Sequence, residues 1–200
     1  MRIVNYKLHK VKQFVQLIID TAKTSSGNFA NSVYNLNMFV IGVFLSTVFF
    51  SPGPDCETAI INNINNSTKT IDAAVYSITN PNIVAALKNA HDRGIKIRIL
   101  TDRTQAGNKK SLVWDMFEYG INVVIHRKYR IEHNKFAIYD GNRLSTGSYN
   151  WTTNASAHNS ENCIFLDTND PAITEYQRRF DYLWETNPSE KSTAWPGLNY

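Results

Sequence analysis

His133-Asn-Lys-Phe-Ala-Ile-Tyr-Asp140, followed by Gly147-Ser-Tyr-Asn150, is the stretch from which the rest of the chain can be interpreted. His133 and Lys135 are two residues apart, and side chains at that spacing on an extended strand point to the same side. An ammonium is costly to bury in a core without an anion, whereas an imidazole and an ammonium that face one spot can both bind a phosphate. The pair therefore predicts phosphate chemistry on one face of a strand.

Downstream residues can complete such a site. Gly147 and Ser148 offer a backbone N–H and a hydroxyl, and Asn150 offers an amide to the same group. Glu161 is the only acid in the stretch from residue 147 to 162, and a carboxylate can hold an imidazole N–H and fix which nitrogen attacks. The pattern has no cluster of carboxylates of the kind that holds Mg²⁺ or Ca²⁺. It therefore predicts phosphoryl chemistry without a metal.

The order H-x-K-x4-D, then x6-G-S-x-N, resembles the signature of the phospholipase D superfamily. Glu161 also stands where the small bacterial members of that family keep the acid that pairs with the histidine. The likeness covers roughly residues 48–187 and is closest to the short single-motif members: the bacterial endonuclease type, the rickettsial-type phospholipase D and the mitochondrial cardiolipin hydrolase. The matched positions are His133, Lys135, Asp140, Gly147, Ser148 and Asn150.

This resemblance implies an α/β fold in which a mixed β-sheet lies between helix layers, with one HKD motif in the chain. It also implies a phosphodiesterase whose active site forms where two such motifs meet. One histidine attacks phosphorus to give a phosphohistidine, and the other protonates the leaving oxygen. Water then hydrolyses the intermediate, with no metal and no other cofactor.

The resemblance also assigns roles to residues. His133 is expected to be the nucleophile in one subunit and the general acid in the other, and Lys135 to neutralise the nonbridging oxygens. Glu161 is expected to hold His133, with a surface ion pair as the alternative. Asp140 belongs to the catalytic motif, but it lies at a turn and is expected to hold that turn rather than to react. The expected phosphate donors are Gly147, Ser148 and Asn150, with turn-capping hydrogen bonds as the alternative.

The chain carries a single complete motif. His126-Arg-Lys128 repeats the H-x-K spacing, but His133 stands where its aspartate should be and no G-S-x-N follows in register. His91 and His158 lack the lysine. The second motif should therefore come from another copy of the chain, in a two-fold homodimer with two identical surfaces face to face. Each subunit would supply His133, Lys135, Ser148, Asn150 and Glu161.

Around the motif, helices and strands alternate from Pro52 onward, which predicts an α/β layer architecture. Asp140-Gly-Asn142 is a tight-turn signal, so the sheet should be mixed rather than all parallel. Asp55 is expected to cap the first helix, and residues 102–110 to form a polar loop. The expected helices span residues 55–66, 80–91, 111–119 and 172–186. The expected strands span residues 70–78, 95–101, 121–125, 136–139, 143–146 and 162–167.

Four segments are expected along the chain. Residues 1–37 form a basic extension with five basic and one acidic residue, while residues 38–200 hold sixteen of each sign. Residues 38–50 are apolar, shorter than the roughly 20 residues of a spanning helix and close to the roughly 7–15 of a signal-peptide core. We expect a signal or short anchor that runs into the first strand, with a buried strand as the alternative. Residues 51–187 should form the catalytic domain and residues 188–200 an irregular tail.

These features favour a secreted, periplasmic or membrane-anchored protein, with a cytoplasmic location left open. Cys56 and Cys163 can form one disulfide if the protein is exported, and two buried thiols are the alternative.

The substrate stays open between two phosphodiesters. From Arg93 to Lys135 there are ten basic and four acidic residues, which suits an anionic substrate and supports a nuclease. The apolar N-terminal segment supports a phospholipase that works at a membrane. A catalytically inactive binding module is disfavoured because no motif residue is lost. Two neighbouring features have further expected roles. His126, Arg127, Lys128 and Arg130 could line the entrance and recruit a polyanion or lipid headgroups. Trp151 should be core or dimer contact rather than a stacking platform or an interfacial anchor.

Overall fold

The computed structural model describes residues 46–168 and 170–187. The predicted basic extension, the apolar segment up to residue 45 and the predicted tail at residues 188–200 lie outside the described residues. The strands are β1 (Ser46–Ser51), β2 (Thr70–Val75), β3 (Lys96–Asp102), β4 (Asn122–His126), β5 (Lys135–Tyr139), β6 (Arg143–Gly147) and β7 (Glu161–Leu166). The helices are α3 (Asp55–Asn65), α4 (Pro81–Asp92), α5 (Arg103–Ala106), α6 (Val113–Glu118), α7 (Thr153–Ala157) and α8 (Pro171–Thr186).

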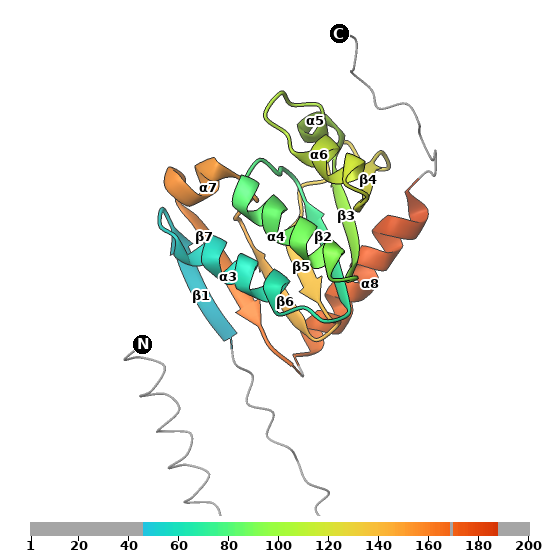
Figure 1. Ribbon diagram of the computed structural model, residues 1–200. Coiled ribbons are helices and arrows are strands. Elements are labelled where there is room, and N and C mark those ends of the chain that lie inside the picture. Colours follow the sequence, from blue (N-terminus) through green and yellow to red (C-terminus); the bar gives the residue numbers. More distant parts are fainter. Residues whose placement is uncertain (1–45, 169, 188–200) are drawn as a thin grey trace, which may run out of the picture. The chain divides into compact units, whose positions relative to one another are not determined.

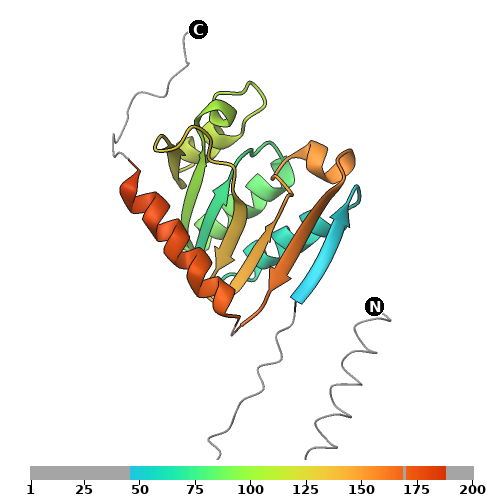
Figure 2. The ribbon, with the colours of Figure 1, turned by 180° about the vertical axis from the view of Figure 1, so that it is seen from behind.

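The strands form one sheet in the order β1-β7-β6-β5-β2-β3-β4. Figure 1 shows α3 and α4 over one face of this sheet, and Figure 2 shows α8 running across the other face. On β2, Ala73 and Ala74 point to opposite faces and both are fully buried, as expected of a strand covered on both sides. Ala74 packs in the cluster that contains Phe180 and Leu183 of α8. The predicted α/β fold with a mixed sheet between helix layers is therefore confirmed.

The direction of strand pairing changes at β2. This strand pairs in parallel with β3 and antiparallel with β5, and β5 pairs antiparallel with β6 across the predicted hairpin. In this register Val75 lies opposite Lys135, and Gly147 lies opposite Cys163. The carboxyl ends of β2 and β6 and the amino ends of β5 and β7 therefore meet at the same end of the sheet.

Three local predictions are wrong. Asp55 does not cap α3: it is the first helical residue after the N-cap Pro54, where its negative charge favours the helix dipole instead. The expected polar loop at residues 102–110 contains α5, because the Asp102 carboxylate accepts hydrogen bonds from the backbone N–H groups of Thr104 and Gln105. Helix α7 has no counterpart among the expected elements. Both missed helices are too short to show a helical period.

Strand β1 lies at the edge of the sheet and pairs with β7. Val48 is 45% exposed and Phe50 is 69% exposed, and Ser51 is the one residue of β1 that is buried. The alternative predicted a buried first strand. A strand does form there, but most of its residues are not buried, so that part of the prediction is wrong. No helix within the described ranges has both the length and the apolar composition needed to cross a bilayer.

Cys56 on α3 and Cys163 on β7 form a disulfide, so of the two alternatives the structure contains the bridge. The sequence separation between them is 107 residues. A crosslink over a loop of this size stabilises the fold chiefly by restricting the unfolded chain.

We predict that removing this crosslink lowers the free energy of unfolding by about 4–5 kcal/mol, the value that loop-closure entropy gives for a loop of roughly this length. Urea titrations of the wild type with and without dithiothreitol measure the difference. The variant Cys56→Ala/Cys163→Ala is the control, and its midpoint should not respond to the reductant. A wild-type midpoint that is unchanged by reduction contradicts the prediction.

Candidate active site

The candidate site lies at the end of the sheet where β5 begins, and Tyr76 is at its centre. Tyr76 directly follows β2, and its backbone N–H donates to the carbonyl of Asn134 at 2.9 Å. The His133 ring lies 4.6 Å from the Tyr76 ring, centroid to centroid, and Lys135 Nζ lies 4.9 Å from the centre of the same ring. The structure thus brings His133 and Lys135 together. His133 precedes β5 rather than belonging to it, so contact with one tyrosine, and not strand alternation alone, unites them.

The Lys135 ammonium is partly desolvated at this end of the sheet. Burial lowers the pKa of Lys135, and the carboxylates of Glu161 and Glu132 partly offset that effect. Its Nζ donates to the backbone carbonyl of His133 at 2.6 Å. No carboxylate forms an ion pair with it among the described residues. A phosphate beside His133 would therefore find a cation that has already lost part of its hydration.

Buried polar contacts fix the chain on both sides of His133. Glu132 is 1% exposed, and its backbone N–H donates to the Asp102 carboxylate at 3.0 Å. The Glu132 carboxylate accepts from the backbone N–H and the side-chain amide of Asn134 at 3.1 and 2.5 Å. Sequence reasoning counted Glu132 only as part of a charge balance. Its position directly before the motif histidine was the available signal in the sequence. Its burial in the structure shows that Glu132 positions the chain rather than adding to a surface charge.

Gly147 allows the next part of the site to form. Its φ is +147°, and a Cβ there would lie 2.3 Å from the carbonyl oxygen of Asn162, so no other residue fits without moving the backbone. The close approach lets the backbone N–H of Ser148 donate to that carbonyl at 3.1 Å. The Ser148 hydroxyl in turn accepts from the backbone N–H of Asn162 at 3.1 Å. Gly147 therefore positions Ser148 against β7.

Glu161 is close to the motif but does not make the expected contact. Its carboxylate accepts from the Ser148 hydroxyl at 2.5 Å and from the Asn159 amide at 3.0 Å. No hydrogen bond joins Glu161 to His133 in the described part of the chain, and His133 contacts the Tyr76 ring instead. The Ser148 hydroxyl proton is therefore committed to Glu161, and a phosphate would compete with that carboxylate for it.

Asn150 carries an unpaired group. Its Oδ1 is buried and has no hydrogen-bond partner among the described residues. Most buried polar atoms in folded proteins are paired, and exceptions concentrate at functional sites. The sequence assigns the amide N–H of Asn150 to a phosphate oxygen, whereas the unpaired Oδ1 is an acceptor and can bind only a donor.

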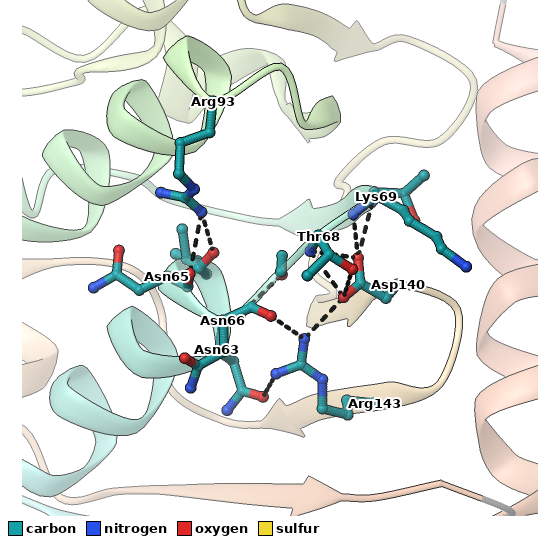
Figure 3. Close-up of polar contacts among 11 residues, drawn as sticks. Asn63, Asn65, Asn66, Thr68, Lys69, Arg93, Asp140 and Arg143 are labelled. Carbon is teal, nitrogen blue, oxygen red and sulfur yellow. Dashed lines mark hydrogen bonds and ion pairs between the residues drawn. The ribbon is translucent and has the colours of Figure 1, made fainter.

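Asp140 lies at the far end of β5 from Lys135, roughly 16 Å away at about 3.3 Å per residue. Its carboxylate accepts from three consecutive backbone N–H groups, those of residues 68 to 70, at 2.7–3.1 Å, and it pairs with Arg143 at 3.2 Å (Figure 3). Burial alone would raise the pKa of Asp140, but these hydrogen bonds and Arg143 hold it below its ordinary value. The geometry supports the expectation that Asp140 holds the turn and does not react.

Figure 3 also shows how this network reaches helix α3. Arg143 donates to the side chain of Asn63 at 3.2 Å and to the carbonyl of Asn66 at 3.3 Å. Arg93 donates to the carbonyl of Asn65 at 3.2 Å. Two cations thus satisfy the last carbonyls of α3, where the helix dipole favours positive charge.

Two neighbours of the motif differ in burial from the residues around them. His126 is 2% exposed, so it does not line an entrance as expected. Its Nε2 accepts the backbone N–H of Tyr129 at 2.8 Å, and burial lowers its pKa against the opposing pull of Glu132 and Asp102. Trp151 is 2% exposed and belongs to the core, as favoured from the sequence. Within the described ranges, no three His, Cys, Asp or Glu side chains gather in a way that could hold a metal ion.

Comparisons with known proteins agree with this geometry. The family model described as "Cardiolipin synthase, PLD-like domain" matches residues 60–184. A mitochondrial cardiolipin hydrolase of Chlamydomonas reinhardtii is 34% identical over 137 residues, which cover 68% of this chain and 60% of that protein. A phospholipase D of Rickettsia prowazekii is 34% identical over 138 residues, which cover 69% of this chain and 67% of that protein.

A solved structure shares the fold. The crystal structure of Nuc from Salmonella typhimurium, a phospholipase D family member, superposes with a TM-score of 0.68 at 25% identity. The match covers 72% of this chain and 96% of Nuc.

We predict that Asp140→Asn lowers the free energy of unfolding at pH 7 by about 1.5–3 kcal/mol, the range for hydrogen bonds to a charged group. Because the folded-state pKa lies below the ordinary 3.8, the carboxylate stabilises the fold above that pH and loses this effect as the pH falls through the folded-state pKa. Urea midpoints of the wild type and the variant should therefore converge on acidification. A gap that keeps its size in acid would show that the charge is not responsible.

Proposed function

Because the chain belongs to the phospholipase D-like family whose model it matches over residues 60–184, we propose that it hydrolyses phosphodiesters through a covalent intermediate on His133. The observation that carries this proposal is the convergence of His133 and Lys135 on the Tyr76 ring. A nucleophile and a desolvated cation at one spot are what attack on a phosphate anion requires.

The reaction proceeds in two displacements. An imidazole nitrogen of His133 attacks phosphorus, and the bond from phosphorus to the leaving oxygen breaks. A second histidine gives its proton to that oxygen and then takes one from water. The water oxygen attacks phosphorus, releases His133 and leaves a phosphomonoester. Lys135 offsets the charge that grows on the nonbridging oxygens, with Ser148 and Asn150 as neutral donors.

The second histidine is the His133 of another copy of the chain. His133 is exposed, so a second subunit can reach it. In a two-fold dimer each subunit then presents the same histidine, as nucleophile on one side of the phosphate and general acid on the other.

We propose a phospholipid as the first substrate class and a nucleic acid as the second. Relatives named phospholipase D and cardiolipin hydrolase support the first. The excess of basic residues between Arg93 and Lys135 supports the second.

We predict that the wild type hydrolyses phosphodiesters in EDTA and that His133→Asn reduces turnover at least 1,000-fold, on the order of the loss that follows removal of a nucleophile. The panel contains cardiolipin, phosphatidylcholine, plasmid DNA and single-stranded RNA. With ³²P-labelled substrate, the wild type should form an acid-labile protein adduct that the variant lacks. His158→Asn, which removes an exposed histidine outside the motif, is the matched control and should turn over normally.

Two results would contradict the proposal. Failure of the wild type to cleave any of the four substrates would exclude those substrate classes. Sedimentation at the assay concentration should show a dimer, and a fully active monomer would exclude the shared site.

We also propose that the protein works outside the reducing cytosol and associates with a membrane through residues 38–50. The disulfide between Cys56 and Cys163 and the apolar segment that runs into β1 support this location. When the cells that make the protein are quenched in acid and the protein is then unfolded in denaturant with maleimide, both cysteines should stay unlabelled, because unfolding exposes any buried thiol. Labelling of both thiols would contradict an oxidising compartment.

A further inference from the structure

An open pocket of about 480 Å³ lies beside His133, within the roughly 300–1,000 Å³ of small-molecule sites. One side is the segment that joins β4 to β5, including Tyr129 and Arg130. The other side includes Arg179 of α8. Because His133 is part of the lining, a substrate whose reacting phosphate meets His133 can extend into this pocket.

Arg130 and Arg179 bring two positive charges to the pocket, which a single acid, Glu132, also lines. Both are exposed, and neither forms a hydrogen bond or an ion pair with another described residue. Arg178, the neighbour of Arg179 on α8, pairs instead with Glu175 at 2.8 Å. The Glu132 carboxylate is buried and accepts hydrogen bonds from Asn134, so the two exposed guanidinium groups leave the open pocket with an excess of positive charge. That excess favours a bound anion, and the planar guanidinium donors fit phosphate oxygens.

Aromatic rings lie beside these cations. Tyr129 stacks on the buried His126 ring at 5.3 Å, and the Arg179 guanidinium carbon lies 5.6 Å from the Tyr129 ring centre. Arg179 also lies 5.5 Å from the ring of Tyr182, and Lys128 Nζ donates to the Tyr182 hydroxyl at 2.8 Å. Tyr129 and Tyr182 are 42% and 43% exposed. Alternating cations and exposed rings are typical of surfaces that follow a single nucleotide strand.

We propose that this pocket is a flanking-phosphate subsite, in which Arg130 and Arg179 bind the phosphate next to the one that His133 attacks. The proposal rests on the function proposed above. Of the two substrate classes proposed there, this pocket favours the nucleic acid, because the neighbouring phosphate would belong to the same nucleotide strand. The subsite selects substrates with successive phosphodiesters over a substrate with one. Ile131 is the one aliphatic side chain of the lining, which favours a strand over an acyl chain.

Two substrates separate the subsite from the reaction itself. Bis(p-nitrophenyl) phosphate has one phosphodiester, and fluorescein-labelled oligothymidylate has many. For Arg179→Gln and Arg130→Gln, the ratio of kcat/KM for the oligonucleotide to that for the single diester should fall about tenfold, as expected from the loss of one charge-assisted contact. The slope of log KM for the oligonucleotide against log salt concentration should also fall by about 0.7 for each lost phosphate contact. Arg178→Gln is the matched control and should keep both values.

Each other outcome has a definite reading. Unchanged ratio and slope in both variants overturn the subsite, while wild-type hydrolysis of the single diester keeps the proposed function. A selective loss with cardiolipin micelles, without a change on the oligonucleotide, overturns the nucleotide strand in favour of a two-phosphate lipid. If the wild type hydrolyses nothing, the proposed function fails, and the same variants are compared by equilibrium binding of the oligonucleotide. An unchanged salt slope of binding then overturns the subsite as well.

Discussion

The antiparallel register of β5 against β2 is the constraint on which the site depends. At one end of β5, Val75 lies opposite Lys135, so Tyr76 meets the residues that precede the strand. At the other end, the Asp140 carboxylate is held by three backbone N–H groups that lead into β2. A slip of one residue would turn Lys135 to the other face of the sheet. The aspartate and the lysine of the motif therefore act at opposite ends of one strand: the first holds the register that the second needs.

Residues next to His133 and Ser148 hold the geometry of the candidate site. Glu132 and Asn134 anchor the chain on either side of His133, and Gly147 brings Ser148 within hydrogen-bonding distance of β7. The Glu161 carboxylate pairs with the Ser148 hydroxyl rather than with His133, its expected partner. A phosphate bound here would replace the Glu161 carboxylate as the acceptor of the Ser148 hydroxyl. Binding would therefore leave that carboxylate without the hydrogen bond from Ser148.

Much of this structure follows from the sequence, and the exceptions have physical causes. The hairpin at Asp140 and the helix opened by Asn80-Pro81 are both found, because turn and capping chemistry are local. Short helices such as α5 carry no period to detect. Tyr76 is distant from the motif in the sequence, and only the folded sheet brings its ring to His133. Glu132 is adjacent to His133, but its burial could not be deduced from a count of charges. The partner of Glu161 could not be deduced either, because the Ser148 hydroxyl and the Asn159 amide both donate to its carboxylate in the folded chain.

The bond between Cys56 and Cys163 divides the described chain into two topological parts. Residues 56–163 form a covalent ring that contains His133, Lys135, Ser148, Asn150 and Glu161, whereas β1 and α8 lie outside this ring. A cut in an exposed loop of the ring would leave its two fragments joined by the disulfide, whereas a cut between Cys163 and α8 would leave α8 and its Arg179 held by packing alone. Proteolysis before α8 can thus separate Arg179 covalently from the motif residues, which the ring keeps on connected chain.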